Sequence, residues 1–560
     1  MNRFVVLVFS LLLTVAGVQA QPSQVKTAVK SMFRLTAYDS AGNATSNTCG
    51  VFVSNNGEAI GAWSALANAA RAEVTDANGK TYAVRSLIGA NELYDVCRFR
   101  VEAAKTPAAT LAKSVATKGA KLWLVQSFDA KKVAATQFEV EREENFMEKY
   151  AYYIFAYNDK GGDAGSLFVN DKGEVAGLLQ ISETTLDTHA VDARFAASLA
   201  FSAFDVNNPL YAKSGIRMQL PADRKQAQLM MMFSAEQQDS AKYAGYIADY
   251  IQLFPQAVDG YSTSALRKSG YGDYAGADAD MQMALKKSDN KAEAHAEYSR
   301  VMYQKLLYSN DSLFNLWTLD KALQQAEEAY KLDPQPAYRH RQAQILYSKK
   351  DFAKAYDIFS SLATSTMANS EVFFEAAQCK TQMGAKNEEI IALLDSAVAH
   401  CERPYTHVAA PYILTRGQMR DAMKDYRGAL ADYNVYDTIM VGRASADFYY
   451  TRYQCEMNMR QYQPALNDIA HAAYVAPADM QPIYLAELAS LQLRVNKLED
   501  AVRTADICLQ ITPDSTDALI IKGVALNGLK KKKEALECLQ RAKELGDPRG
   551  EEFIKKYSNQ

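Results

Sequence analysis

The stretch GGDAGSLFVNDKGEVAGLL, residues Gly161–Leu179, is the most informative part of the chain for its fold. It opens with glycines next to Asp163 and Ala164 and continues into an Asn-x-x-Gly turn from Asn170 to Gly173. Short β-branched and aromatic runs with turn residues between them surround it from about Val25 to Ala200, among them FRLTAY, CGVFVS, KLWLVQSF and YYIFAY. Runs of this kind indicate strands, so the region is predicted to form an all-β barrel or sandwich.

Two further segments precede this stretch, CGVFVSNNGEAIGAWSALANA and YDVCRFRV. In this order the three segments resemble the motifs of a chymotrypsin-like secreted serine protease of the bacterial type, over roughly 25–200. The resemblance implies a trypsin-like double β-barrel. It places Ser64 where the family has its general-base histidine, Asp95 where it has the orienting aspartate, and Ala164 where it has the nucleophile. The Gly-Pro that follows the family's nucleophile is replaced by Ser166 and Leu167.

The chemistry of these positions can be judged from the residues themselves. A serine nucleophile needs a base that takes its proton and returns it to the leaving group, and in this mechanism the base is an imidazole. The chain has six histidines and none precedes His189, while Ala164 has no atom that can attack. The sequence therefore predicts a pseudoprotease without catalytic residues, with Ser64, Asp95 and Ala164 as vestigial triad positions. Ser166 as a displaced nucleophile and His189 as a relocated base are weaker alternatives.

From about Pro221 to the end, alanines recur at helical spacing. Ala465, Ala501 and Ala535 lie in similar segments 36 and 34 residues apart, and 33 residues separate Ala322 from Ala355. A period near 34 with this alanine pattern resembles tetratricopeptide (TPR) repeats, which implies about seven or eight pairs of helices between 227 and 545. The predicted fold class is multidomain, with an all-β trypsin-like double barrel followed by an all-α TPR solenoid.

The first 20 residues predict a secretory signal peptide. Arg3 precedes an apolar run from Phe4 to Val18, which is too short to span a bilayer comfortably, and Val18 and Ala20 suit a cleavage site. The residue after the expected cleavage site is Gln21 rather than a cysteine that could carry a lipid. No later stretch is long and apolar enough to be predicted as a transmembrane segment. The mature chain is therefore predicted to be exported and to be periplasmic or associated with the cell envelope.

These patterns predict five segments along the chain. They are a signal peptide at 1–20, an inactive trypsin-like domain at 21–205, a linker at 206–221, a TPR-like α-solenoid at 222–550 and a C-terminal tail at 551–560.

Composition and motifs narrow the chemistry. A formal net charge of −3 gives no sign of nucleic-acid binding. The chain has no Cys-x-x-Cys, His-Glu-x-x-His or phosphate-loop motif, so no cofactor and no metal site is expected. Seven cysteines are present. Cys49 and Cys97 both fall in strand-like segments, but spacing alone leaves open whether they pair.

The function predicted from this organisation is non-catalytic binding or scaffolding in the cell envelope. A repeat array presents a concave face, and such a face binds peptides, helices or domains. The partner is therefore expected to be a protein or peptide, for example in an outer-membrane or periplasmic complex. Tyr449, Tyr450 and Tyr453 are the first candidates for the contact, because aromatic anchors dominate interface energy. Two alternatives stay open: a serine-peptidase-family protein with residual or unrecognised activity, and a periplasmic chaperone or assembly factor.

Overall fold

The computed structural model describes residues 22–558 except 127–132, 157–161, 183–186, 238, 310 and 312. The predicted signal peptide and Gly161 lie outside the described residues. No helix in the described ranges has the length and the apolar run that crossing a bilayer requires. The chain divides into two compact units, residues 1–290 and 291–560.

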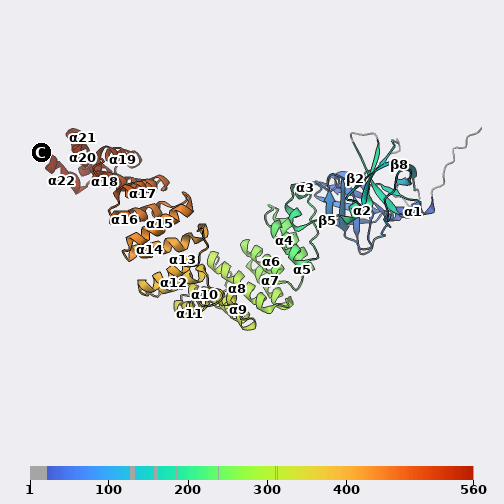
Figure 1. Ribbon diagram of the computed structural model, residues 1–560, viewed down its shortest axis with the longest axis horizontal. Coiled ribbons are helices and arrows are strands. Elements are labelled where there is room, and N and C mark those ends of the chain that lie inside the picture. Colours follow the sequence, from blue (N-terminus) through green and yellow to red (C-terminus); the bar gives the residue numbers. More distant parts are fainter. Residues whose placement is uncertain are drawn as a thin grey trace, which may run out of the picture. The chain divides into compact units, whose positions relative to one another are not determined.

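The N-terminal part contains two closed antiparallel barrels of six strands each (Figure 1). The first barrel follows the order β1 (Met32–Tyr38), β2 (Ala44–Phe52), β3 (Glu58–Gly61), β6 (Val96–Val101), β5 (Thr81–Asn91) and β4 (Arg71–Asp76). The second follows the order β10 (Leu167–Val169), β11 (Val175–Gln180), β12 (Thr188–Asp192), β9 (Tyr150–Phe155), β8 (Ala135–Phe146) and β7 (Lys121–Val125). The predicted trypsin-like double barrel is confirmed.

Three apolar clusters hold this part together. Phe33, Phe52 and Phe99 pack inside the first barrel, and an aromatic cluster that includes Phe155 and Phe168 fills the second. A third cluster contains residues of both barrels and of two short helices, α1 (Ser23–Ala28) and α2 (Ala193–Ser198). Because dense apolar packing resists rearrangement, this shared cluster fixes the two barrels against each other.

About 20 helices follow the barrels and confirm the predicted all-α region (Figure 1). They are α3 (Pro209–Ala212), α4 (Arg224–Ser234), α5 (Ser240–Leu253), α6 (Val258–Gly270), α7 (Tyr274–Lys287), α8 (Lys291–Tyr308), α9 (Leu319–Leu332), α10 (Pro336–Ser348), α11 (Phe352–Leu362), α12 (Ser370–Gln382), α13 (Asn387–Ala399), α14 (Ala410–Ala422), α15 (Tyr426–Met440), α16 (Ala446–Asn458), α17 (Tyr462–Val475), α18 (Gln481–Arg494), α19 (Leu498–Ile511), α20 (Thr516–Gly528), α21 (Lys532–Glu544) and α22 (Pro548–Ser558). Three 3₁₀ turns are η1 (Val29–Ser31), η2 (Ala203–Asn207) and η3 (His407–Ala409).

The segment predicted as a linker, 206–221, packs on the first barrel. The Leu87 amide donates to the Arg217 carbonyl at 2.9 Å, and the Gln219 amide donates to the Leu87 carbonyl at 2.6 Å. Met218 is buried and bonds through its amide to the Tyr246 hydroxyl of α5. The first compact unit thus continues through this segment to Asn290, and the residues predicted as a tail, 551–560, begin inside α22. Where independently folding domains begin and end stays a prediction.

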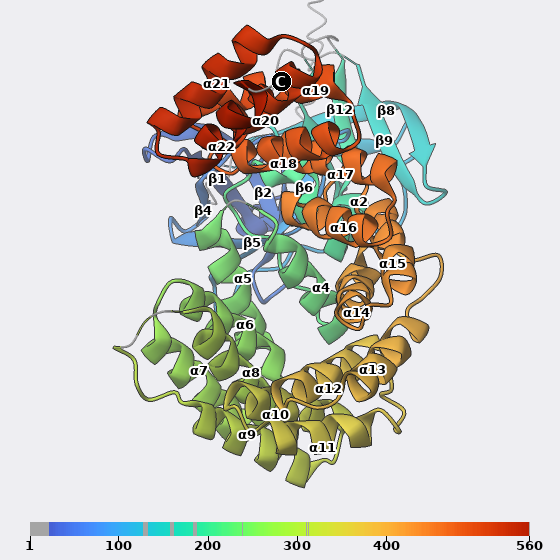
Figure 2. The same cartoon turned by 90° about the vertical axis from the view of Figure 1, so that its left-hand side faces the viewer.

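The helices pack in consecutive pairs that repeat one turn geometry. Figure 2 shows two successive pairs, α10–α11 and α12–α13, side by side. In seven pairs a residue between the two helices has a left-handed backbone, with φ between 56° and 80°; these residues are Gly272, Lys350, Gly384, Lys424, Arg460, Asn496 and Lys530. A left-handed residue at this place is a common way to end a helix. The same turn therefore recurs along the array even where its residue type changes.

The alanines that carry the sequence period are fully buried between paired helices. Ala322, Ala355, Ala465, Ala501 and Ala535 all have no exposed surface. In the last of these pairs, a Cβ added at Gly523 of α20 would lie 2.8 Å from the Leu539 side chain of α21. Small residues at these positions let the two helices approach closely, as the sequence pattern predicted.

A charged core runs through α14 to α17 inside the second unit. Arg416 of α14 binds Asp432 of α15 through two hydrogen bonds, of 2.5 and 3.0 Å. Arg452 of α16 binds Asp468 of α17 in the same way, with distances of 2.5 and 2.8 Å. Both members of the second pair lie 36 residues after those of the first. The array thus repeats a paired charge as well as a backbone turn.

Glu456 of α16 lies in this core, only 5% exposed. Burial, aided by the nearby Asp468 carboxylate, raises its pKa from 4.5 to about 8, although Arg452 opposes the change. The folded chain therefore holds this proton more tightly than the unfolded chain does. The contribution of protonated Glu456 to the free energy of unfolding is therefore fully present at low pH and is lost as the pH rises from about 4.5 to about 8. We expect the free energy of unfolding to fall over that window by up to about 1.4 kcal/mol per pH unit.

The test compares urea unfolding of the full chain at pH 5, 6, 7 and 8, followed by helical circular dichroism. Glu456→Gln should remove this slope, because an amide carries no titrating proton. Glu499→Gln, at an exposed position of α19, should retain it. An unchanged slope in Glu456→Gln would show that the buried carboxyl does not set the pH dependence.

Candidate functional site

Ser64 and Asp95 meet because their strands are neighbours. β3, which precedes Ser64, pairs with β6, which Asp95 precedes. The Ser64 amide donates to Asp95 Oδ1 at 2.6 Å and its hydroxyl donates to Oδ2 at 2.9 Å. Asp95 has a left-handed backbone with φ of 44°. Burial raises the pKa of the Asp95 carboxyl, and the bonds from Ser64 act in the opposite direction.

The loop around Ala164 leads into β10 of the second barrel and also contacts the first barrel. The Cys49 amide of β2 donates to the Ala164 carbonyl at 2.8 Å, and the Gly165 amide donates to the Leu179 carbonyl of β11. Gly165 has φ of +80°, and a Cβ added there would lie 2.1 Å from the Cys49 carbonyl oxygen and 3.6 Å from the Ala62 amide nitrogen. Only glycine fits this approach. The loop therefore packs against Ala62, which precedes Ser64 by two residues in the chain. The structure thus brings all three predicted positions into one region.

Two polar side chains adjoin Ala164: Ser166, which the sequence analysis weighed as a displaced nucleophile, and Cys49, which it did not place there. The Cys49 thiol lies near Ser166 and Asp163. Burial raises the pKa of this thiol to about 11, which keeps it protonated near neutral pH, and a thiol is a weak nucleophile in that state. Ser166 is buried next to Gly162. In the sequence, Cys49 is visible only as the first residue of the Cys-Gly that opens the first motif. Nothing in that motif indicates that Cys49 contacts the loop around Ala164.

The cysteines and the histidine weighed from the sequence make contacts of other kinds. Cys97 is a free thiol that donates to the Gly61 and Ala62 carbonyls at 3.5 Å, and Cys49 is free as well. The pairing left open above is thus not formed in the structure. His189 lies on β12, opposite Ile154 and Gln180, and its ring packs on Tyr152 with centroids 5.6 Å apart.

The three tyrosines predicted to contact a partner differ in burial. Tyr449 and Tyr453 are 5% and 4% exposed. Tyr449 donates to Asp437 of α15 at 3.1 Å, and Tyr453 donates to Glu487 of α18 at the same distance. Tyr450 is half-buried and stacks on Tyr453. Packing between helices therefore occupies Tyr449 and Tyr453, and Tyr450 alone of the three keeps an accessible face.

Comparison with known families agrees with this geometry. A model described as trypsin-like peptidase domain matches residues 48–178, which include Cys49, Ser64, Asp95 and Ala164. A search among curated proteins found no similar chain. The N-terminal part is thus a trypsin-like peptidase domain built of two six-stranded barrels, and an all-helical region follows it.

Proposed function

We propose that this chain is an exported, non-catalytic binding or scaffolding protein of the cell envelope. It joins a pseudoprotease domain to a TPR array that holds a protein partner. Ala164 carries the proposal, because acyl transfer in a trypsin-like site needs a nucleophilic oxygen or sulfur at that place. Export to the periplasm is proposed from the signal-peptide pattern of residues 1–20.

The Ser64–Asp95 pair supports loss of the acid–base function. In the family's mechanism the aspartate orients an imidazole and stabilises its protonated form. Here both Asp95 oxygens accept hydrogen bonds from Ser64, at 2.6 and 2.9 Å. A hydroxyl in that place has no basic nitrogen to accept a proton from a nucleophile. The arrangement is therefore suited to holding the loop between β3 and β4 rather than to moving protons.

The identification of the helical region as a TPR array rests on two periodic features. The first is the left-handed turn within successive helix pairs, and the second is the set of fully buried alanines at a spacing near 34. In such arrays the first helix of each pair lines the concave face. The segments Tyr338–Tyr347, Tyr449–Met457 and Ile483–Leu493 belong to first helices and are the proposed binding surface.

Within this surface, accessible apolar side chains are the proposed anchors. Tyr450 of α16 keeps an open face, and Ile483 at the start of α18 is 58% exposed. Tyr450 also contacts Tyr484 of α18, with ring centroids 5.5 Å apart. The two anchors therefore lie on neighbouring first helices, which suits a partner segment that runs across the pairs.

A pull-down from envelope extract tests this surface. We expect the full mature chain to recover a defined envelope protein, and Tyr450→Ala/Ile483→Ala to recover roughly tenfold less, as loss of a central anchor typically does. Tyr474→Ala removes an exposed tyrosine from α17, a second helix, and should leave recovery unchanged. Equal recovery by both variants, with helical content preserved, would move the partner site away from the first helices.

A further inference from the structure

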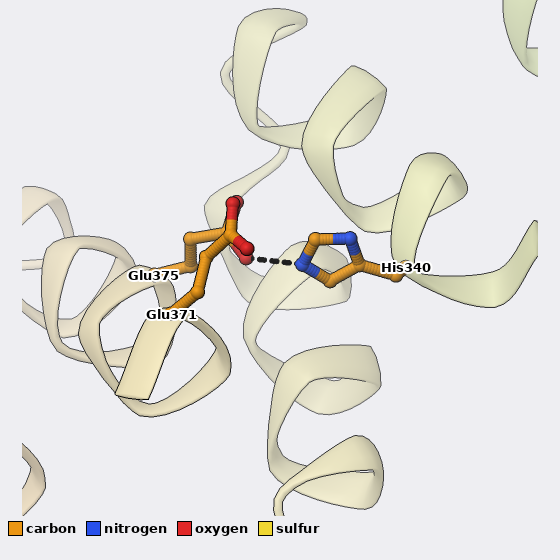
Figure 3. Close-up of side chains that lie close together, drawn as sticks. All are labelled: His340, Glu371 and Glu375. Atoms are coloured by element: carbon orange, nitrogen blue, oxygen red, sulfur yellow. Dashed lines mark hydrogen bonds and ion pairs between the residues drawn. The ribbon is translucent and has the colours of Figure 1, made fainter. Parts of the chain in front are cut away.

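One group of three potential metal ligands exists among the described residues of the helical array. His340 lies on α10, and Glu371 and Glu375 lie on α12. The imidazole nitrogen and the two carboxylate oxygens all lie within 4.8 Å of one another. Figure 3 shows the two glutamates next to each other on α12, with their carboxylates near the imidazole of His340.

The backbone explains how the group forms. Glu371 and Glu375 are four residues apart on one helix, which places both side chains on the same face. His340 comes from the first helix of the preceding pair and is 9% exposed. Its Nε2 lies 2.5 Å from Glu375 Oε2. The group therefore joins two successive helix pairs, and Glu371 supplies a second carboxylate at an exposed position.

Polar side chains surround Glu375 in particular. Gln344, one turn after His340, donates through Nε2 to Glu375 Oε1 at 2.8 Å and so orients that carboxylate. The amide oxygen of Gln344 is buried with no hydrogen-bond partner in the described structure. Gln344 and Glu375 also line a cavity of about 230 Å³ together with Tyr303, Arg341 and Tyr347. Arg341 lines this cavity with Glu375, and its positive charge opposes a cation bound at Glu375, whereas the group as a whole supplies two carboxylates.

We propose that His340, Glu371 and Glu375 bind a divalent transition-metal ion of the zinc type. One imidazole nitrogen and two carboxylate oxygens form a donor set that suits Zn²⁺, and three protein ligands leave a coordination position for water or a partner's carboxylate. Binding replaces the direct His340–Glu375 contact by two bonds to the metal. The ion then links α10 to α12. The sequence analysis expected no metal site. It missed this group because the three ligands come from two separate helices and form no recognised metal-binding motif.

Equilibrium dialysis of the full mature chain against Zn²⁺, after removal of metals with a chelator, tests the proposal. We expect one ion to bind per chain at this site. Glu371→Gln should weaken the binding at least about 10-fold, and Glu371→His should restore it, because imidazole is again a ligand. Glu388→Gln, at an exposed glutamate of α13 outside the group, is the matched control and should bind like the natural chain.

Cobalt substitution identifies the ligands. Co²⁺ held by nitrogen and oxygen should give visible d–d bands without the intense thiolate charge-transfer band that the cysteines would produce. The proposal is overturned if the natural chain binds no Zn²⁺. It is equally overturned if Glu371→Gln binds as tightly as Glu388→Gln, or if the bands report thiolate ligands and disappear in Cys401→Ser, which would place the ion at the neighbouring Cys401.

Discussion

The purified mature chain is expected to hydrolyse no peptide, ester or casein substrate above background. Ala164 cannot form an acyl-enzyme, and Ser64 cannot act as a base for any neighbouring hydroxyl. In serine proteases, losing the serine or the histidine alone costs about as much as losing the whole triad, on the order of 10⁶-fold in kcat. Both are replaced in the proposed site, so no turnover that depends on the triad is expected.

Substitutions that rebuild the triad sharpen this prediction. Ala164→Ser alone should stay at background, because no base accepts its proton. Ser64→His/Ala164→Ser should react measurably with a fluorophosphonate probe, because Asp95 lies where it can orient an imidazole at position 64. Ser166→Ala in that double variant should leave the labelling unchanged. Labelling of the natural chain at any serine within 25–200 would contradict the pseudoprotease, and loss of the label with Ser166→Ala would identify Ser166 as the nucleophile.

Arg452→Met is expected to lower the free energy of unfolding of the helical region by about 3–5 kcal/mol. Arg452 is buried between Asp468 and Asp437, with N–O distances of 2.5 and 3.0 Å, and Glu456 lies in the same core. Removing the guanidinium leaves the Asp468 carboxylate buried without its counter-charge, and the cost of an unpaired buried charge is in this range. The burial of Arg452 is what makes the expected effect large.

Arg503→Met is the matched control for this measurement. Its side chain is 70% exposed and pairs with Asp500 along the surface of α19, so its loss should cost less than about 1 kcal/mol. Urea unfolding followed by helical circular dichroism compares the two variants. Arg452→Met/Asp468→Asn should recover part of the lost stability, because it removes a carboxylate that the first change left unpaired. A loss below about 1 kcal/mol in Arg452→Met would show that water reaches this core.

The sequence alone was sufficient for the features that depend on neighbours along the chain. The change from short β-branched runs to alanines at helical spacing predicted an all-β region followed by helices, and the three protease-like motifs implied that the β region is a double barrel. The spacing of Ala465, Ala501 and Ala535 predicted close-packed helix pairs, because a small residue at a fixed place is a local requirement. The Gly-Asp-Ala-Gly segment indicated the loop at Ala164 before any contact was known. Each of these signals arises within one turn, one strand or one repeat.

Only the tertiary structure decided which distant side chains meet. Tyr449, Tyr450 and Tyr453 share one helix, yet contacts with α15 and α18 bury the first and the last and leave Tyr450 accessible. Likewise, residues 206–221 pack on β5, although their sequence predicted a linker. His340 reaches Glu375 across 35 residues, and Ser64 reaches Asp95 across 31. Backbone periodicity is encoded locally, whereas the partner of a side chain depends on how separate elements pack, which no single segment specifies.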